Sequence, residues 1–238
     1  MSGMLIKRPM SHYLYFAFLG IAIAIVGFIP TYFGPLATGS EKFSWIMHVH
    51  GLFGALWLTT YLIQTWMINI NQKRLHMRIG YIAVFIAVGV VVTLQMVAFD
   101  AVNIGVSKGK DVIPNILGPI LDSIAFAFLF GAAIYFRKKS EVHKRLMLLA
   151  TILVLWVAWV RLRHYFPPFP GAFNFFGFFL GMMPIPIIWI VEYLKTRKIH
   201  YVMLYGGVAV IAEQGFQILF YDSHYWRMTS NAIYDYLS

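Results

Sequence analysis

Residues 79–102 read IGYIAVFIAVGVVVTLQMVAFDAV, an apolar stretch in which Asp100 is the only charged side chain. A helix rises about 1.5 Å per residue, so a stretch of this length can cross the roughly 30 Å hydrocarbon core of a bilayer. A soluble core does not need an apolar run of this length. The stretch therefore predicts a membrane-spanning helix.

Six similar apolar blocks flank this stretch. Together the predicted spans cover residues 13–33, 45–70, 79–102, 116–136, 146–160, 173–194 and 201–221. The first block is too long for the apolar part of a cleaved signal peptide, so we expect it to remain as a span. The other residues suffice for short loops and for a tail at 222–238, which we expect on the outer surface. The expected fold is a single all-α membrane domain over residues 1–238, with about seven transmembrane helices.

The composition excludes several classes of protein. Of the 238 residues, 60% are hydrophobic and 12% are charged, whereas a soluble domain carries about 25% charged residues. The chain has no cysteine, which excludes disulfides, thiolate metal sites and cysteine nucleophiles. The net charge of +10 lies in short clusters between apolar blocks. That pattern argues against a nucleic-acid partner and predicts contacts with anionic lipid at the cytoplasmic rim.

The lysines and arginines also predict the orientation in the membrane. If the N-terminus is cytoplasmic, thirteen of them lie on the cytoplasmic side and six on the other side. Cytoplasmic loops carry an excess of these residues, so we expect the N-terminus inside and the C-terminus outside. We expect the chain to be a multi-pass protein of the cell inner membrane.

A repeated motif lies on the predicted cytoplasmic side. It reads Leu-His-Met-Arg-Ile at 75–79 and Val-His-Lys-Arg-Leu at 142–146. One interpretation is a b-type haem held by His76 and His143, since haem iron takes axial histidines from facing helices. The other is a helix-start unit that binds lipid phosphate. Because the adjacent cations must reach water or headgroups, we expect both histidines near the surface, which favours the interfacial interpretation.

A second polar group lies in the outer half of the predicted bundle. His50 begins a stripe that continues through Trp57, Tyr61 and Gln64 on one helical face, so it is a better inward candidate than His48. The other ionisable members come from three further predicted spans or their ends: Asp122, Arg161, Arg163, His164 and Glu213. Buried charges are costly in a bilayer unless they are paired, so we expect Arg161 or Arg163 to balance the carboxylates.

This outer group has three interpretations. His50, Asp122, His164 and Glu213 have side chains suited to a divalent metal such as zinc, copper or iron, and His50 and His164 could also hold a haem. The same residues could instead form a structural ion-pair network without a metal. A third interpretation is a proton-linked or small-ligand cavity.

The order of the motifs also carries a resemblance. It runs from His50-Gly51 and Trp57 through LHMRIG at 75–80, Asp122 and HKRLM at 143–147 to Arg161. Over residues 45–165 this order resembles a family of uncharacterised bacterial multi-pass membrane proteins with HRRLG and HKRLM motifs. It is more distantly similar to the cytochrome b561 type, a transmembrane haem carrier. That type has histidine ligands in four successive helices, whereas the fourth predicted span here has Asp122 and no histidine. The resemblance therefore does not imply a complete two-haem arrangement.

We expect, from these observations, a membrane-embedded redox or ligand-binding protein whose metal or haem site opens on the outer side. The alternative is a non-catalytic accessory or assembly subunit of a larger membrane complex, because no complete catalytic motif is present. A small transporter is not supported, since the sequence lacks an evident inverted repeat with paired broken helices.

Overall fold

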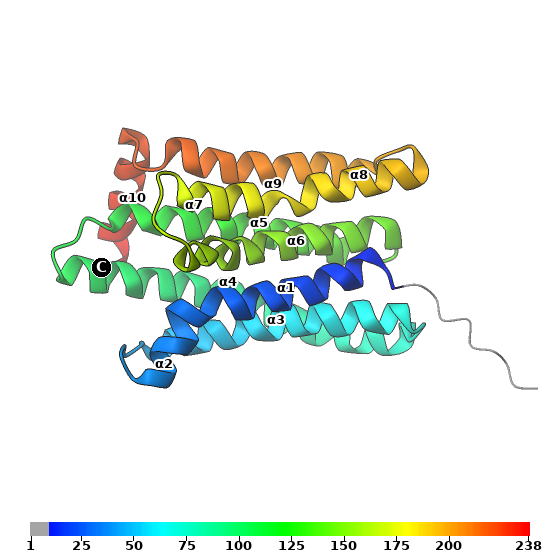
Figure 1. The fold of residues 1–238 in the computed structure, drawn as a ribbon, viewed down its shortest axis with the longest axis horizontal. Coiled ribbons are helices and arrows are strands. Elements are labelled where there is room, and N and C mark those ends of the chain that lie inside the picture. The colour runs from blue at the N-terminus through cyan, green and yellow to red at the C-terminus, as the bar shows by residue number, and fades with distance from the viewer. Residues whose placement is uncertain (1–9) are drawn as a thin grey trace, which may run out of the picture.

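The computed structural model describes residues 10–238, and over this range the chain forms helices and no strand. Seven helical segments are long and apolar enough to cross a membrane, and they lie side by side along the long axis of the molecule (Figure 1). They are His12–Thr38, Trp45–Asn69, Lys73–Ser107, Ile113–Tyr135, Ser140–Tyr165, Ala172–Thr196 and Tyr201–Phe220. The expected all-α bundle of seven spans is confirmed, and the protein is a multi-pass membrane protein.

Several spans consist of more than one helical element. The elements are α1 (His12–Phe28), the π-helix η1 (Ile29–Phe33), α2 (Gly34–Thr38), α3 (Trp45–Asn69), α4 (Lys73–Ser107), the 3₁₀ turn η2 (Ile113–Ile116), α5 (Leu117–Tyr135), α6 (Ser140–Arg161), the 3₁₀ turn η3 (Leu162–Tyr165), α7 (Ala172–Asn174), the π-helix η4 (Phe175–Leu180), α8 (Pro184–Thr196), α9 (Tyr201–Phe220) and α10 (His224–Leu237).

Two helices begin earlier than the hydropathy predicts. The third span was expected over 79–102, but α4 begins at Lys73 and includes Arg74 and Arg78. Likewise α6 begins at Ser140, six residues before the predicted start of the fifth span. Long basic side chains can extend from a helix to water, so charged residues end an apolar pattern without ending the helix. Both repeated histidines therefore lie within helices.

Proline accounts for the interruption of the sixth span. A π-helix occupies Phe175–Leu180, and a regular helix resumes at Pro184. Proline lacks the amide hydrogen that a helix interior needs, but it is well accommodated in the first turn. Gly171, with a φ of 78°, lets the preceding proline-rich loop turn into this span.

Helices α3, α4, α5 and α6 form a four-helix unit within the bundle. Contacts connect α3 with α4, α4 with α5, α5 with α6 and, more loosely, α3 with α6. Helices α4 and α6 therefore occupy opposite corners of the unit. Helix α1 packs against α3 and α6, while α9 packs against α6 and, less extensively, α5. Helix α6 is thus surrounded by neighbours, and most of its side chains are buried.

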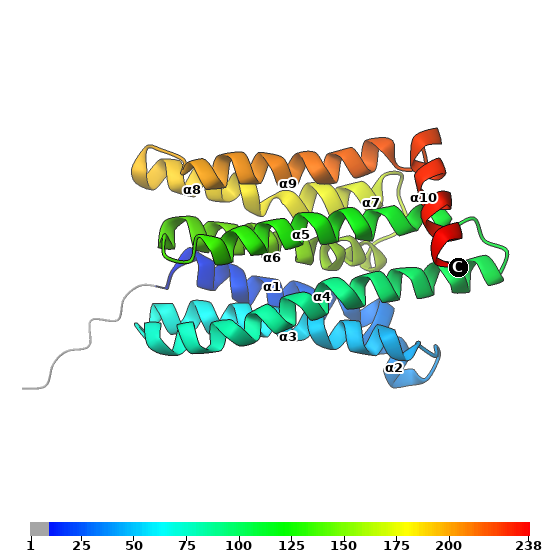
Figure 2. The ribbon, with the colours of Figure 1, turned by 180° about the vertical axis from the view of Figure 1, so that it is seen from behind.

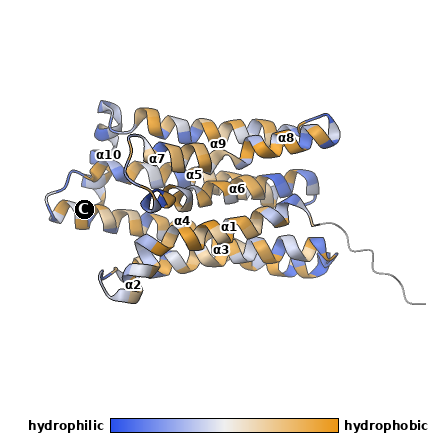
Figure 3. Cartoon of the chain, viewed as in Figure 1, coloured by the Kyte–Doolittle hydropathy of each residue, from blue (hydrophilic) through white to orange (hydrophobic). Residues whose placement is uncertain are grey.

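The two ends of the bundle differ in composition. We call the end that carries the start of α1 and the α3–α4, α5–α6 and α8–α9 connections the basic end. The opposite end, which carries α2, η3 and α10, is the aromatic end. Polar residues gather at both ends while the middle is apolar (Figure 3). Lys7 and Arg8, which contribute to the predicted cytoplasmic charge, lie outside the described residues.

The expected tail at 222–238 is largely a helix. Helix α10 crosses the aromatic end of α5 nearly at right angles to the spans (Figure 2). Trp226 Nε1 donates a hydrogen bond of 2.8 Å to the carbonyl oxygen of Pro114. Arg227 pairs with Asp111 at 2.9 Å and with Asp222 at 2.6 Å. These contacts fasten α10 to the loop before α5.

Candidate functional site

His50 and Thr93 form the first part of the outer group. Nδ1 of His50, on α3, lies 3.0 Å from Oγ1 of Thr93 on α4, and that hydroxyl donates to the carbonyl oxygen of Gly89. His48 faces differently: it is exposed, and its Nδ1 lies 2.6 Å from the hydroxyl of Tyr32. The polar stripe below His50 is buried, as the helical spacing predicts, with Trp57, Tyr61 and Gln64 each at most 9% exposed.

Asp122 and Glu213 form a separate part. Asp122 is buried on α5, and its Oδ1 accepts hydrogen bonds from Nε2 of Gln214 at 2.7 Å and Nε2 of Gln217 at 2.9 Å. Both of these amides, which lie on α9, also donate to the carboxylate of Glu213. Trp156 Nε1 donates to the other oxygen of Asp122 at 3.1 Å. Two amides therefore bridge two carboxylates within the apolar region.

The four proposed metal ligands are not gathered in one place. His164 is exposed within η3, and the contacts of His50 are with Thr93 rather than with the carboxylate pair. Within residues 10–238, no three histidine, aspartate or glutamate side chains are grouped as they would be around a metal ion. The structure brings together only Asp122 and Glu213 of the four.

The two arginines require a correction. We expected Arg161 or Arg163 to neutralise the carboxylates, but neither forms an ion pair with a carboxylate of the described chain. Arg161 donates to Oγ1 of Thr31 at 3.2 Å, and its guanidinium lies 4.3 Å from the ring centre of Phe28. Arg163 donates to the carbonyl oxygen of Val160 at 2.8 Å. Backbone, hydroxyl and aromatic groups, rather than carboxylates, therefore surround these two cations.

At the basic end, the structure brings His76 and His143 together. Their ring centres are 6.2 Å apart, and the ring planes are nearly perpendicular, at 86°. His76 lies on α4 and His143 on α6, which are opposite corners of the four-helix unit. The two side chains therefore approach each other across the axis of that unit, where bundles of this kind hold cofactors.

A backbone carbonyl orients the ring of His143. Its Nδ1 lies 2.8 Å from the carbonyl oxygen of Ala133, and because a carbonyl only accepts, Nδ1 carries the hydrogen. In this tautomer Nε2 has the lone pair that can bind a metal. Nδ1 of His76 is buried and has no partner among the described residues.

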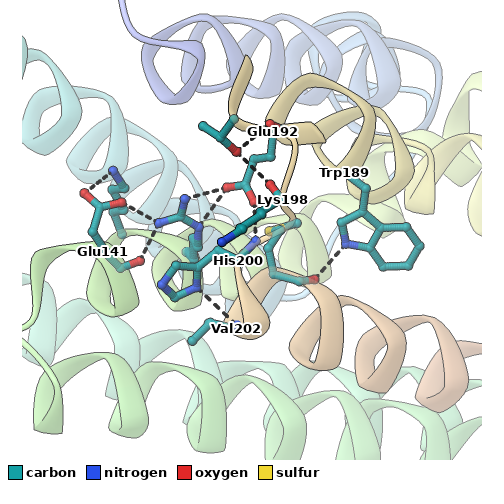
Figure 4. A network of polar contacts seen from close by, with 10 residues as sticks. Glu141, Trp189, Glu192, Lys198, His200 and Val202 are labelled. Atoms are coloured by element: carbon teal, nitrogen blue, oxygen red, sulfur yellow. Dashed lines mark hydrogen bonds and ion pairs between the residues drawn. The ribbon is translucent and has the colours of Figure 1, made fainter. Parts of the chain in front are cut away.

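Arg145, in the second motif, lies deeper than its charge predicts. We expected it to reach water, but its side chain is only 10% exposed and pairs at 2.6 Å with Glu192, which is 7% exposed (Figure 4). Arg145 also donates to the side chain and the carbonyl of Glu141. The charge of Arg145 is therefore neutralised inside the bundle, whereas Lys144 and Glu141 remain 37% and 58% exposed.

Glu192 is the functional residue that the sequence reasoning missed. Its Oε1 accepts from Arg145 Nε at 2.8 Å, and its Oε2 accepts from the His200 amide at 2.9 Å. It joins α6 to α8 and to the start of α9 (Figure 4). The available signal was that Glu192 is the only acidic residue of its apolar block, and such a residue requires a partner in a membrane.

Further buried polar atoms lie toward the basic end of α1 and α3. Five of them have no hydrogen-bond partner among residues 10–238 and belong to four side chains: Nε2 of His12, the hydroxyls of Tyr13 and Tyr61, and both amide atoms of Gln64. Buried hydroxyl, imidazole and amide groups form hydrogen bonds with water or another polar ligand where one can reach them.

Comparisons of the chain with protein-family models, with curated proteins and with solved structures found no match. The resemblance drawn from the motifs stays a prediction.

Proposed function

We propose that the protein is a membrane-embedded redox protein that binds a haem or a single metal ion through His76 and His143. The observation that carries this proposal is the approach of two imidazoles from opposite corners of a four-helix unit, with 6.2 Å between ring centres. Two metal–nitrogen bonds of about 2 Å, with about 1 Å from each nitrogen to its ring centre, require a separation of about 6 Å.

The remaining features of the basic end fit a haem better than an isolated ion. Haems that transfer electrons commonly have two axial ligands from the protein, as in the cytochromes c, and the pair supplies two. The carbonyl of Ala133 fixes the orientation of the His143 ring, as backbone partners of metal-binding histidines commonly do. The nearby cations Lys73, Arg74, Arg78 and Lys139 can pair with the acidic side groups of a porphyrin.

Within this proposal, several residues of the basic end have defined roles. His76 and His143 would hold the metal, and the carbonyl of Ala133 orients the His143 ring. The Arg145–Glu192 ion pair keeps α6 and α8 together beside His143. A bound haem supplies one-electron transfer, which the side chains of this cysteine-free protein do not provide by themselves.

An absorption spectrum and a metal analysis of the purified full-length protein test the proposal. We expect a Soret band, or one metal ion per chain, that is lost in His76→Ala and in His143→Ala. His48→Ala is the matched control and should keep the signal, because His48 is exposed and lies at the aromatic end of α3. A wild-type protein with neither a Soret band nor stoichiometric metal would contradict the proposal.

We also propose a cation or proton site at Asp122 and Glu213, the part of the outer group that lies together. The supporting observation is that two carboxylates share the amides of Gln214 and Gln217 without an arginine or lysine beside them. Two neighbouring carboxylates in an apolar region are more stable when they share one proton or one cation. Metal analysis of Asp122→Asn distinguishes this site from the histidine pair, because only metal bound at the carboxylates would be lost.

The cellular setting belongs to the same proposal. We propose that the protein lies in the cell inner membrane with its basic end in the cytoplasm, where its cations meet anionic lipid. The excess of lysine and arginine at the connections of that end supports this orientation.

A further inference from the structure

We propose that the basic end of the bundle contains a water-filled inlet between α1 and α3 that reaches from His12 to Tyr61. The inlet does not depend on a metal or haem at His76 and His143. Its ligand is water, because the groups that line it are hydroxyl, amide and imidazole donors and acceptors without partners among the described residues.

The lining residues come from two helices that pack against each other. On α3, Tyr61 and Gln64 are three residues apart and face the same way, and both are at least nine-tenths buried. On α1, Tyr13 is 7% exposed, and the ring centre of Phe16, three residues further along, lies 6.3 Å from that of Tyr61. The Ser11 amide donates to Oδ1 of Asn69 at 3.2 Å, which fixes the start of α1 against the end of α3.

The position of His12 defines the open end of the inlet. His12 is the first residue of α1 and is partly exposed, its ring centre is 4.2 Å from that of Tyr13, and its buried Nε2 has no partner among residues 10–238. The ammonium group of Lys144 lies 5.4 Å from the ring centre of Tyr13, so the mouth is next to a charged rim. Water can therefore enter from the basic end.

Aromatic packing closes the deep end. Trp57, one turn beyond Tyr61 on α3, is 1% exposed and makes edge contacts with Phe126 and Phe130, whose ring centres are 4.9 and 5.6 Å away. Lipid cannot supply hydrogen bonds to the polar atoms below this plug, and the apolar side chains of the core cannot either. Water from the basic end is the occupant that satisfies hydroxyls and an amide in a narrow space.

The absence of cysteine makes a direct test possible with single-cysteine variants. A charged, membrane-impermeant methanethiosulfonate reagent is applied to the basic end in sealed vesicles that contain Gln64→Cys. The controls are Ile63→Cys, whose parent side chain is 40% exposed on the outside of α3, and Leu129→Cys, whose parent side chain is 6% exposed in the apolar core. Leu129 lies at a similar distance from the basic end of α5, so it controls for depth.

We expect Gln64→Cys to react at least about tenfold faster than both controls, because a thiol must be in contact with water to ionise and react. Tyr61→Cys should react more slowly than Gln64→Cys but faster than Leu129→Cys, and it carries the test if Gln64→Cys does not fold. Equal rates at all four positions, or reaction at positions 61 and 64 only from the aromatic end, would overturn the proposal.

Discussion

Glu192 accepts hydrogen bonds from the Arg145 guanidinium and from the His200 amide, so both oxygens of this carboxylate have partners inside the bundle. This pairing determines how substitutions of these residues affect stability. Removing one partner of a buried ion pair leaves the other charge without compensation, whereas replacing both with apolar side chains leaves no buried charge.

We expect Glu192→Ala to lower the free energy of unfolding by about 3–5 kcal/mol. The double variant Arg145→Met with Glu192→Leu should be closer to wild type than Glu192→Ala. Glu141→Ala is the control, because the Glu141 side chain is 58% exposed and its ion pairs contribute at most about 1 kcal/mol. Thermal unfolding in mild detergent measures all three, and equal losses in Glu192→Ala and Glu141→Ala would contradict the prediction.

His200 makes part of the stability depend on pH. Burial, followed by the nearby charge of Arg145, lowers the pKa of His200 below its ordinary value of 6.5. Nδ1 of His200 accepts a hydrogen bond from the Val202 amide at the start of α9, which a protonated ring cannot do. The unfolded chain therefore binds a proton more readily than the folded one, so this contribution is complete above about pH 6.5 and decreases as the pH falls.

We expect His200→Asn to remove this part of the pH dependence, because asparagine caps a helix and does not titrate. Melting temperatures measured from pH 5 to pH 8 should decrease less toward acid in the variant than in the wild type. An unchanged acid slope in His200→Asn would show that other groups are responsible.

At the scale of elements, small residues set how closely α1 approaches α6. A Cβ atom on Gly27 would overlap the carbonyl oxygen of Ala158 in the backbone of α6. Backbone cannot move aside as the end of a flexible side chain can, so the two helices would separate. Gly54, on α3, has no atom within 4 Å of the position of its Cβ.

We expect Gly27→Ala to destabilise the protein by about 1–3 kcal/mol through overpacking. Gly54→Ala should be neutral or slightly stabilising, because alanine has the higher helix propensity. The difference in melting temperature between the two variants is the measurement. Equal behaviour would indicate that α1 is not closely packed on α6.

The membrane-spanning helices were predictable from hydropathy, but the helix starts and α10 were not. All seven spans were found, because lipid requires long apolar helices and the chain has little else. The starts of α4 and α6 were not found, since Lys73 and Ser140 lie among charged residues that helices tolerate at a membrane surface. Helix α10 was missed as a helix because it is not a span, and only its surface position was expected.

The candidate site was predictable only in part, because it depends on the arrangement of the helices in the whole molecule. Sequence gives the depth of a residue along its own helix, so His50, Asp122, His164 and Glu213 were all assigned correctly to one end. It does not give the order of the helices around the bundle. That order separates His50 from the carboxylates, and it brings His76 opposite His143.

The whole molecule also makes a prediction about sidedness. Seven spans place the start of α1 and helix α10 on opposite sides of the membrane, and the charges favour a cytoplasmic basic end. In intact cells, an impermeant thiol reagent should label Asn231→Cys in α10 but not Ser140→Cys at the basic end, although both parent residues are exposed. The opposite labelling pattern would invert the proposed orientation.

The Arg145–Glu192 ion pair has a consequence for synthesis at the ribosome. The two residues are 47 positions apart, and chains elongate at about 5–20 residues per second, so Arg145 precedes its partner by roughly 2–9 s. Glu141, one turn before Arg145 on the same helix, is already made by then and can hold the guanidinium during that interval. We therefore expect Glu141 to pair with Arg145 while α6 inserts into the membrane, and Glu192 to join this pair when α8 emerges.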